Sequence, residues 1–200
     1  MPRDSTWDEA FRSSPFRLRF ELGGETLGIE APVPRFVQAY GRARQIATEV
    51  FEQSRTVWGI VAAWPATAKG IFPPAPEGFQ ALAAAGFSAP AKAQWTAPPY
   101  PGAEDEEAAA VEWRAFDLTE NLAARDVLLW CSASYEMEIS PKAQILAYLA
   151  DLERGILLRV YDDRGMDLTA LTPEPLLHLY RARTEWLLNY DRERMRTAFE

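Results

Sequence analysis

The feature that most restricts the fold of this sequence is a run of three apolar segments separated by short polar turns. The segments are residues 144–152, 156–161 and 166–171, and each has the length and composition of a β-strand. The two linkers between them, residues 153–155 and 162–165, both end in glycine, as tight turns often do. Strands joined by turns this short pair antiparallel. The sequence therefore predicts an antiparallel meander.

Other segments also have the pattern of strands. Residues 16–22 alternate, with Phe16, Leu18, Phe20 and Leu22 on one face, and the Gly23-Gly24 pair predicts a turn into a short return strand over 26–30. Residues 56–64 are continuously apolar, which is typical of a strand buried on both faces. The same reasoning predicts strands over 110–118 and over 127–139.

Helical periodicity is restricted to two regions of the chain. Apolar residues recur at three and four positions through 35–53, which predicts an amphipathic helix of about five turns. Thr172, Pro173 and Glu174 resemble a helix start, and the stripe from Leu176 to Tyr190 predicts a long terminal helix followed by a short one after Asp191. The expected fold is a single α+β domain over 1–200, with a mostly antiparallel sheet of about six or seven strands and two main helices.

The segment over 65–108 differs from the rest of the chain. Eight of the fifteen prolines lie there, and proline runs cannot join the interior of a sheet. Residues 77–85 are compatible with a short helix, and an acidic run closes the segment. We expect a proline- and alanine-rich insert or long loop that crosses one edge of the domain.

Composition excludes several classes of function. A formal net charge of −8 argues against nucleic-acid binding, which needs clustered Lys and Arg. No apolar run reaches the ~20 residues of a membrane span, and the first residues lack the hydrophobic core of a signal peptide. We therefore expect a cytoplasmic protein that contacts neither nucleic acid nor membrane.

The densest carboxylate group is Asp162 and Asp163, with Asp167 just beyond the turn. Three such oxygen ligands could hold Mg²⁺ or Ca²⁺. The alternative is that aspartates at turn positions accept hydrogen bonds from nearby backbone N–H groups, with Arg164 neutralising a neighbour. Glu136 and Glu138 would share one strand face at about 7 Å, a spacing compatible with acid–base chemistry or with two solvated side chains.

The remaining reactive residue types do not assemble into a known motif. Cys131 is the only cysteine and His178 the only histidine, so neither a disulfide nor a His/Cys zinc site can form within the chain. We expect both residues to be structural. Glycine-rich phosphate loops of the GxxxxGK[ST] and GxGxxG types are absent, and we expect no cofactor.

Two further features point to partner binding. Residues 104–167 carry fifteen acidic and six basic side chains, a net charge of −9, and the run begins with Glu104, Asp105, Glu106 and Glu107. Such a region would attract a basic partner. Trp95 lies in the expected insert, where an exposed aromatic ring could anchor a partner or fix its own loop to the body of the protein.

Parts of the chain resemble an uncharacterised bacterial family, the domain of unknown function 3885. The resemblance rests on residues 161–167 taken with 186–194, and on the opening stretch 17–23 followed by the helix that contains Arg42 and Arg44. The family supplies no catalytic residues. Small acidic proteins of such families are often immunity or accessory proteins encoded near bacterial toxins, and the resemblance implies that class by analogy.

Two functional hypotheses follow from these observations. The first is a non-enzymatic binding protein of the immunity type, which neutralises a basic partner such as a bacterial toxin through Glu104–Glu107, Glu136, Glu138, Asp162, Asp163 and Trp95. The second is a metal-dependent hydrolase that uses Asp162, Asp163 and Asp167, with Glu136 or Glu138 as the base. The oligomeric state is not predicted by either hypothesis.

Overall fold

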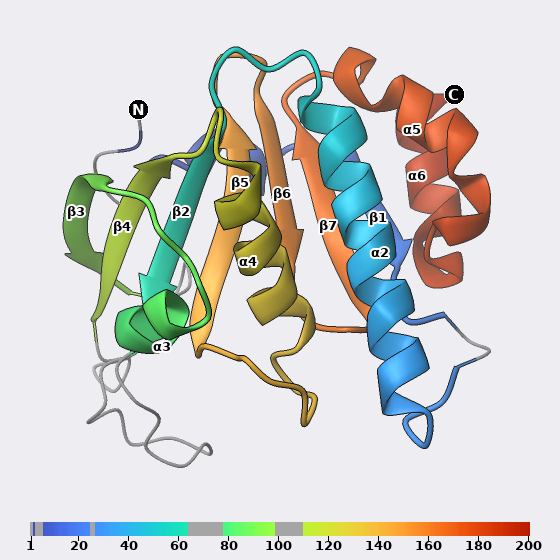
Figure 1. Cartoon of the computed structure of the whole chain (residues 1–200). Helices are drawn as coiled ribbons and strands as arrows, with labels where there is room; N and C mark the ends of the chain where they lie inside the picture. Colours follow the sequence, from blue (N-terminus) through green and yellow to red (C-terminus); the bar gives the residue numbers. More distant parts are fainter. Residues whose placement is uncertain (1, 3–5, 25–26, 64–77, 99–109) are drawn as a thin grey trace.

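A computed structural model describes residues 2, 6–24, 27–63, 78–98 and 110–200 of the chain. In this part of the chain, seven strands form one antiparallel sheet in the order β1-β7-β6-β5-β2-β4-β3 (Figure 1). The strands are β1 (Arg17–Glu21), β2 (Trp58–Ala63), β3 (Ala91–Ala97), β4 (Val111–Asp117), β5 (Ile145–Asp151), β6 (Ile156–Val160) and β7 (Gly165–Ala170). The predicted α+β class and antiparallel sheet are confirmed.

The meander predicted from the C-terminal segments is β5, β6 and β7. Asp151 closes the first turn, because its carboxylate accepts hydrogen bonds from the backbone N–H groups of Glu153 and Arg154 at 3.0 and 2.9 Å. Gly155 has φ +62° in that turn, a backbone conformation that suits glycine. β1 pairs with β7, so the meander extends to one edge of the sheet.

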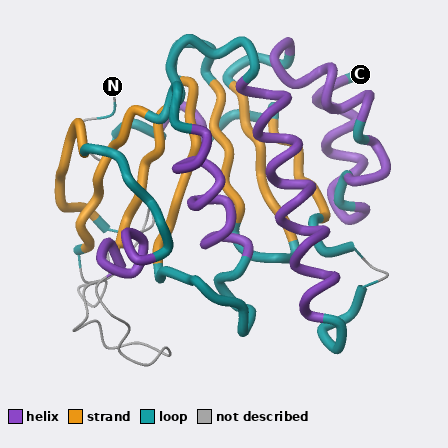
Figure 2. The backbone as a smooth tube through the Cα atoms, in the orientation of Figure 1, coloured by secondary structure: helices purple, strands orange, loops and turns teal. Residues whose placement is uncertain are grey.

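All the described helices except the short N-terminal one cover one face of the sheet, and they appear as a separate layer in Figure 2. The helices are α1 (Glu9–Arg12), α2 (Pro32–Phe51), α3 (Gly78–Ala84), α4 (Leu122–Ala133), α5 (Leu177–Ala182) and α6 (Arg192–Phe199), with 3-10 turns at Glu174–Leu176, Thr184–Trp186 and Asn189–Asp191. α2 is the amphipathic helix predicted over 35–53. Its buried stripe, which includes Phe36, Ala43, Ile46 and Val50, packs on the main core.

The strand predicted over 127–139 is wrong, because its first half is the end of α4. Asn121 caps this helix by accepting a hydrogen bond from the Ala124 N–H at 3.0 Å, and the helix ends at Ala133. α4 packs beside α2 and over β5 and β6. A short run of apolar residues is expected both in a strand buried on two faces and in a buried helix. The run that begins at Val127 therefore could not distinguish the two structures.

The long helix predicted from Leu176 to Tyr190 is also wrong, whereas the short helix predicted after Asp191 is confirmed as α6. Leu187 has an extended backbone and bridges Phe20, and the Leu188 N–H donates to the Arg19 carbonyl at 2.8 Å. The chain therefore leaves the helix to pair briefly with β1, and α5 and α6 lie on either side of this break. Residues 27–30 form a bend and turn, so the described part of the predicted return strand is not a strand.

The described part of the expected insert contributes to the domain itself. Residues 78–98 hold α3 and β3, and β3 pairs with β4 as the outermost strand at that end of the sheet. α3 falls within the predicted short helix. The remaining residues of 65–108 lie outside the described ranges.

The opposite face of the sheet carries a second, smaller apolar cluster. Trp113 is its centre and stacks on Trp95 of β3, with ring centroids 6.1 Å apart. Trp7 meets Trp113 and Tyr148 edge-on, at 6.2 and 5.1 Å. Phe11 of α1 is buried in the same cluster, so the N-terminal segment covers part of this face.

Candidate functional site

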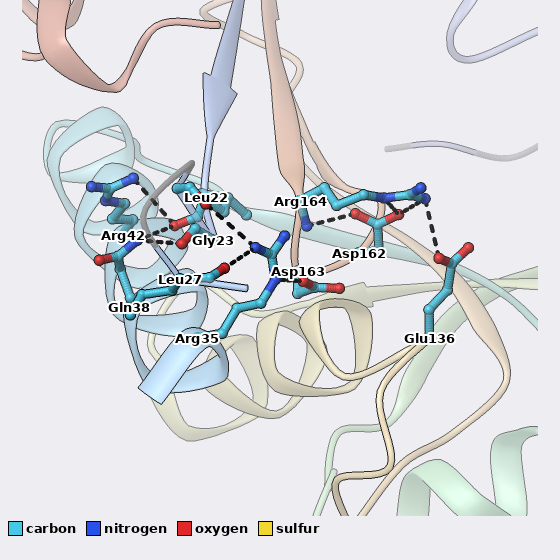
Figure 3. Close-up of polar contacts among 11 residues, drawn as sticks. Leu22, Gly23, Leu27, Arg35, Gln38, Arg42, Glu136, Asp162, Asp163 and Arg164 are labelled. Atoms are coloured by element: carbon cyan, nitrogen blue, oxygen red, sulfur yellow. Dashed lines mark hydrogen bonds and ion pairs between the residues drawn. The ribbon is translucent and has the colours of Figure 1, made fainter. Parts of the chain in front are cut away.

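The turn between β6 and β7 holds the carboxylates that the sequence singled out. Asp162 is almost fully buried and accepts hydrogen bonds from the Arg164 backbone N–H at 2.7 Å and from its Nε at 2.8 Å (Figure 3). The hydrogen bond between the two side chains and the negative charge of Asp162 raise the pKa of the Arg164 guanidinium. Glu136 lies on the far side of the same guanidinium, 3.2 Å from Arg164 Nη2. The Arg164 side chain is thus held between two carboxylates.

Asp163, the next residue of the turn, forms an ion pair with Arg35 of α2. Its carboxylate accepts a short hydrogen bond from Arg35 Nε, and both side chains are about one-tenth exposed. Arg35 also donates to the carbonyl of Gly24 and to that of Leu27, the latter shown in Figure 3. This arginine therefore joins the β6–β7 turn, the segment after β1 and the first turn of α2. An aspartate bound in this way supports the fold and is not open to a partner.

Two further side chains of α2 hold the same corner of the molecule. Gln38 Nε2 donates to the carbonyls of Leu22 and Gly23 at 3.2 and 2.6 Å, and Arg42 Nη1 donates to the Glu21 carbonyl at 2.9 Å. They provide hydrogen bonds to backbone carbonyls at and just after the end of β1. The chemistry of this corner is structural.

The third proposed metal ligand is separate from this turn. Asp167 lies on β7, in register with Arg19, and the Arg19 Nε is 3.0 Å from its Oδ1. Arg19 also pairs with Asp191 at 3.0 Å. Within the described ranges, no group of three or more His, Cys, Asp or Glu side chains is placed to hold a metal ion. The structure thus assigns arginine partners to all three aspartates.

The other predicted partner-binding residues are dispersed. Glu138 is exposed in the segment after α4, close in sequence to Glu136, and neither belongs to a strand. Trp95 is half-buried on β3 and stacked on Trp113, so it fixes the edge strand to the sheet. Glu104–Glu107 lie outside the described residues.

Cys131 and His178 belong to different helices, α4 and α5. Burial raises the pKa of the Cys131 thiol to about 11, so the thiol is protonated at neutral pH. His178 is exposed on the outer side of α5.

An apolar surface lies on the outer side of the helical layer, and the sequence did not indicate it. We call it the α2–α4 surface and define it as Val33, Val37, Tyr40, Val127 and Trp130. Val33 and Val37 are 63% and 62% exposed and lie one helical turn apart on α2. Tyr40 continues this stripe and meets Trp130 of α4 edge-on, with ring centroids 5.5 Å apart. Val127 is one turn before Trp130 on α4.

The α2–α4 surface contains a pocket of about 260 Å³. Its lining consists of Tyr40, Ala85, Asp126, Val127, Trp130 and Pro141. Asp126 is the charged group of the lining, and it pairs with Arg44 of α2 at 2.9 Å. Burial and the charge of Asp126 raise the pKa of Tyr40, so the phenol keeps its proton at neutral pH and can donate a hydrogen bond.

Val37 is one of the recurring apolar residues of the helix predicted over 35–53, so periodicity alone would assign it to the buried stripe. The structure puts it outside that stripe, because α2 buries the side that carries Phe36, Ala39 and Ala43. The signal that could have identified the surface is the width of the apolar arc. Val33, Val37 and Tyr40 widen the apolar arc of this helix, and packing against one face of the sheet cannot bury an arc of that width.

Among the described helices, none has both the length and the apolar character needed to cross a membrane. Comparison with curated proteins and with solved structures finds no match to this chain. A family model does match, and it spans residues 3–191, almost the whole sequence. The sheet, the arginine-bound turn and the α2–α4 surface all lie within that span, and the chain therefore belongs to the family described as "Domain of unknown function (DUF3885)".

Proposed function

We propose that this protein acts by binding another protein, which docks on the α2–α4 surface. The observation that carries the proposal is the exposure of Val33 and Val37 beside the half-buried rings of Tyr40 and Trp130. Apolar area that is left in water costs about 25 cal/mol per Å², and a partner would recover this free energy on binding. Single exposed apolar residues are ordinary, but a contiguous group on two helices is typical of an interaction surface.

The surroundings of the surface also suit an interface. Aromatic rings at the centre and an ion pair beside them match the usual composition of a protein interface, with an apolar core and a polar rim. Tyr40 and Trp130 are residue types that often dominate binding energy. The Asp126–Arg44 pair would lie at the edge of the contact, where a partner's polar groups can replace water.

The partner class that we propose is a basic protein, such as a bacterial toxin that this chain neutralises in the cytoplasm. The net charge of −8 favours it, because opposite charge accelerates association. Of the carboxylates first considered, Asp162 and Asp163 are buried and paired within the fold, whereas Glu136 and Glu138 are exposed. Neutralisation would then require no catalytic residue, only a tight complex.

The test is to co-express this chain with the product of the neighbouring open reading frame and to measure growth and complex formation. Val37→Asp introduces a charge into the α2–α4 surface and should weaken the complex by at least about tenfold. Tyr190→Asp is the matched control, since Tyr190 is 90% exposed and lies outside the surface. Isothermal titration calorimetry gives the affinities.

The proposal predicts that the wild type and Tyr190→Asp bind the partner and restore growth, while Val37→Asp does neither. It fails if the neighbouring product neither binds nor is neutralised. It also fails if Val37→Asp binds as tightly as the wild type, because the contact would then lie elsewhere.

A further inference from the structure

A second pocket lies on the face of the sheet opposite the helical layer. It has a volume of about 170 Å³ and is bounded by α1 on one side and by strands β1, β7, β6 and β5 on the other. Its lining residues are Asp8, Phe11, Arg12, Arg17, Tyr148, Leu157, Arg159, Asp167 and Thr169. None of them belongs to the α2–α4 surface, so this pocket is independent of the proposed function.

The order of the strands explains why arginines gather here. Arg17 and Leu157 both lie opposite Thr169 of β7, and Arg19 and Arg159 both lie opposite Asp167. Residues that are opposite each other in neighbouring strands share one face, so two rows of side chains cross this end of the sheet. The rows bring Arg17 and Arg159 to the pocket, and α1 adds Arg12.

The lining is basic although the chain as a whole is acidic. Three arginines and two aspartates line the pocket, which gives it a formal charge of +1. Asp8 is paired with Arg12 at 2.7 Å, and Asp167 is paired with Arg19 from outside the lining. The two carboxylates are therefore already engaged with guanidinium groups.

Arg17 differs from the arginines in these ion pairs. Its Nε donates to the Thr169 hydroxyl at 3.2 Å, and within the described residues its side chain has no carboxylate partner. The hydroxyl orients the guanidinium without neutralising it. A guanidinium presents a planar set of N–H donors that matches a carboxylate in a bidentate arrangement.

The rest of the pocket is apolar and aromatic. Phe11 and Leu157 are nearly buried, and the Tyr148 ring lies below the Arg159 guanidinium, with Cζ 5.7 Å from the ring centroid. Pockets for drug-sized ligands measure roughly 300–1,000 Å³, so this smaller pocket suits a single ring or a short chain. A ligand that suits this pocket therefore has an apolar part that packs on the apolar residues and an anionic group that pairs with the guanidinium.

We propose that this pocket binds a small organic acid, a carboxylate attached to an aromatic or aliphatic group. The carboxylate contacts Arg17, and the apolar part rests on Phe11, Tyr148 and Leu157. A monoanion matches the formal charge of +1, whereas a doubly charged phosphate ester would leave one negative charge uncompensated in the pocket.

The experiment titrates the full chain with phenylacetate and follows backbone amide shifts by NMR. Three probes of the same size vary the charge, namely phenylacetamide (neutral), phenethylamine (cationic) and phenyl phosphate. Saturable shifts are expected for residues of the pocket, and each of the other probes should bind at least about tenfold more weakly than phenylacetate. A capped tripeptide with a central glutamate tests whether the acid belongs to a protein instead.

Arg17→Gln should weaken phenylacetate binding about tenfold or more, and Arg196→Gln, an exposed arginine of α6 outside both sites, is the matched control. The proposal is overturned if phenylacetamide binds as well as phenylacetate, if the shifts map away from the pocket, or if the peptide binds more tightly than the free acid. The comparison of probes uses the wild-type protein, so it decides the question even if Arg17→Gln does not fold.

Discussion

Arg35 shows how a single side chain can hold several segments together. Its guanidinium reaches the carboxylate of Asp163 and the carbonyls of Gly24 and Leu27, and the arginine and aspartate side chains are only about one-tenth exposed. A charge at this depth is tolerated because the guanidinium pairs with a carboxylate and donates to two backbone carbonyls. Removal of one partner leaves the other buried without compensation.

Arg35→Met should lower the free energy of unfolding by about 3–5 kcal/mol, the usual cost of breaking a buried ion pair. The measurement is urea denaturation followed by circular dichroism. The double variant Arg35→Met with Asp163→Leu should recover part of this loss, and the exposed Arg196→Met should change little. An unfolding midpoint for Arg35→Met equal to that of the wild type would show that the pair has no structural role.

Cys131 allows a pH-dependent prediction. The buried thiol has a pKa of about 11, raised above its ordinary value of 9.0, so burial favours its neutral form. The stability that it contributes is complete below about pH 9 and is lost as the pH rises from there towards 11. The alkaline loss of stability, measured by urea denaturation, should therefore be smaller in Cys131→Val than in the wild type.

Reactivity provides a second measurement on the same residue. At pH 8 the native thiol should react with iodoacetamide about a hundredfold more slowly than the thiol in urea, because its thiolate fraction is reduced to that degree. Rapid labelling of the folded protein would instead indicate an exposed or activated cysteine.

Individual elements differ in how well the sequence predicted them. The meander and β1 were predicted because alternation and glycine turns are local signals, and α2 because a stripe of 3.6-residue period runs through it. α4 was mistaken for a strand because Val127 to Cys131 is apolar in either conformation. The distinguishing signal was Asn121, an N-cap residue directly before the helix.

Tertiary contacts explain the other differences between the predicted and the observed elements. β3 was hidden between proline-rich flanks, and its strand depends on pairing with β4. The break in the terminal helix follows from the contact of Leu187 and Leu188 with β1, which periodicity in one segment cannot reveal. The same holds for both pockets, since their linings come from distant segments. The carboxylates were found in the sequence, but their arginine partners were mostly remote.

Asn121→Ala tests the start of α4. Loss of the cap hydrogen bond to the Ala124 N–H should cost about 1 kcal/mol, whereas Asn121→Ser keeps a capping acceptor and should cost less. Both variants lose the hydrogen bond from Asn121 Nδ2 to the Ser88 carbonyl, so that loss does not affect their comparison. Urea denaturation of both variants gives the two values. Equal stability of Asn121→Ala and the wild type would indicate that packing alone fixes the helix start.

For the molecule as a whole, the two faces of the sheet have different chemistry. The helical layer presents the apolar α2–α4 surface, and the opposite face presents a small basic pocket within an acidic protein. The two proposed sites do not overlap, so we expect that a protein partner and a small acid would bind at the same time. The net charge of −8 would act over a longer range than either site and affect the rate of association.

Charge reversal tests that long-range effect. Glu136→Lys combined with Glu138→Lys should slow association with the basic partner by roughly two- to tenfold and leave dissociation nearly unchanged. The difference from the wild type should shrink at high salt, since screening removes it. Stopped-flow kinetics at two ionic strengths gives both rates. Association that is unaffected at low salt would mean that these glutamates are only solvated.

Hydrogen exchange on the complex with the protein partner tests the central claim most directly. The account predicts that binding protects amides in the first turns of α2 and along α4, around Val37 and Trp130, and leaves the β6–β7 turn unchanged. Protection restricted to the opposite face of the sheet, or to the turn with Asp162 and Asp163, would contradict the assignment of the α2–α4 surface as the docking site.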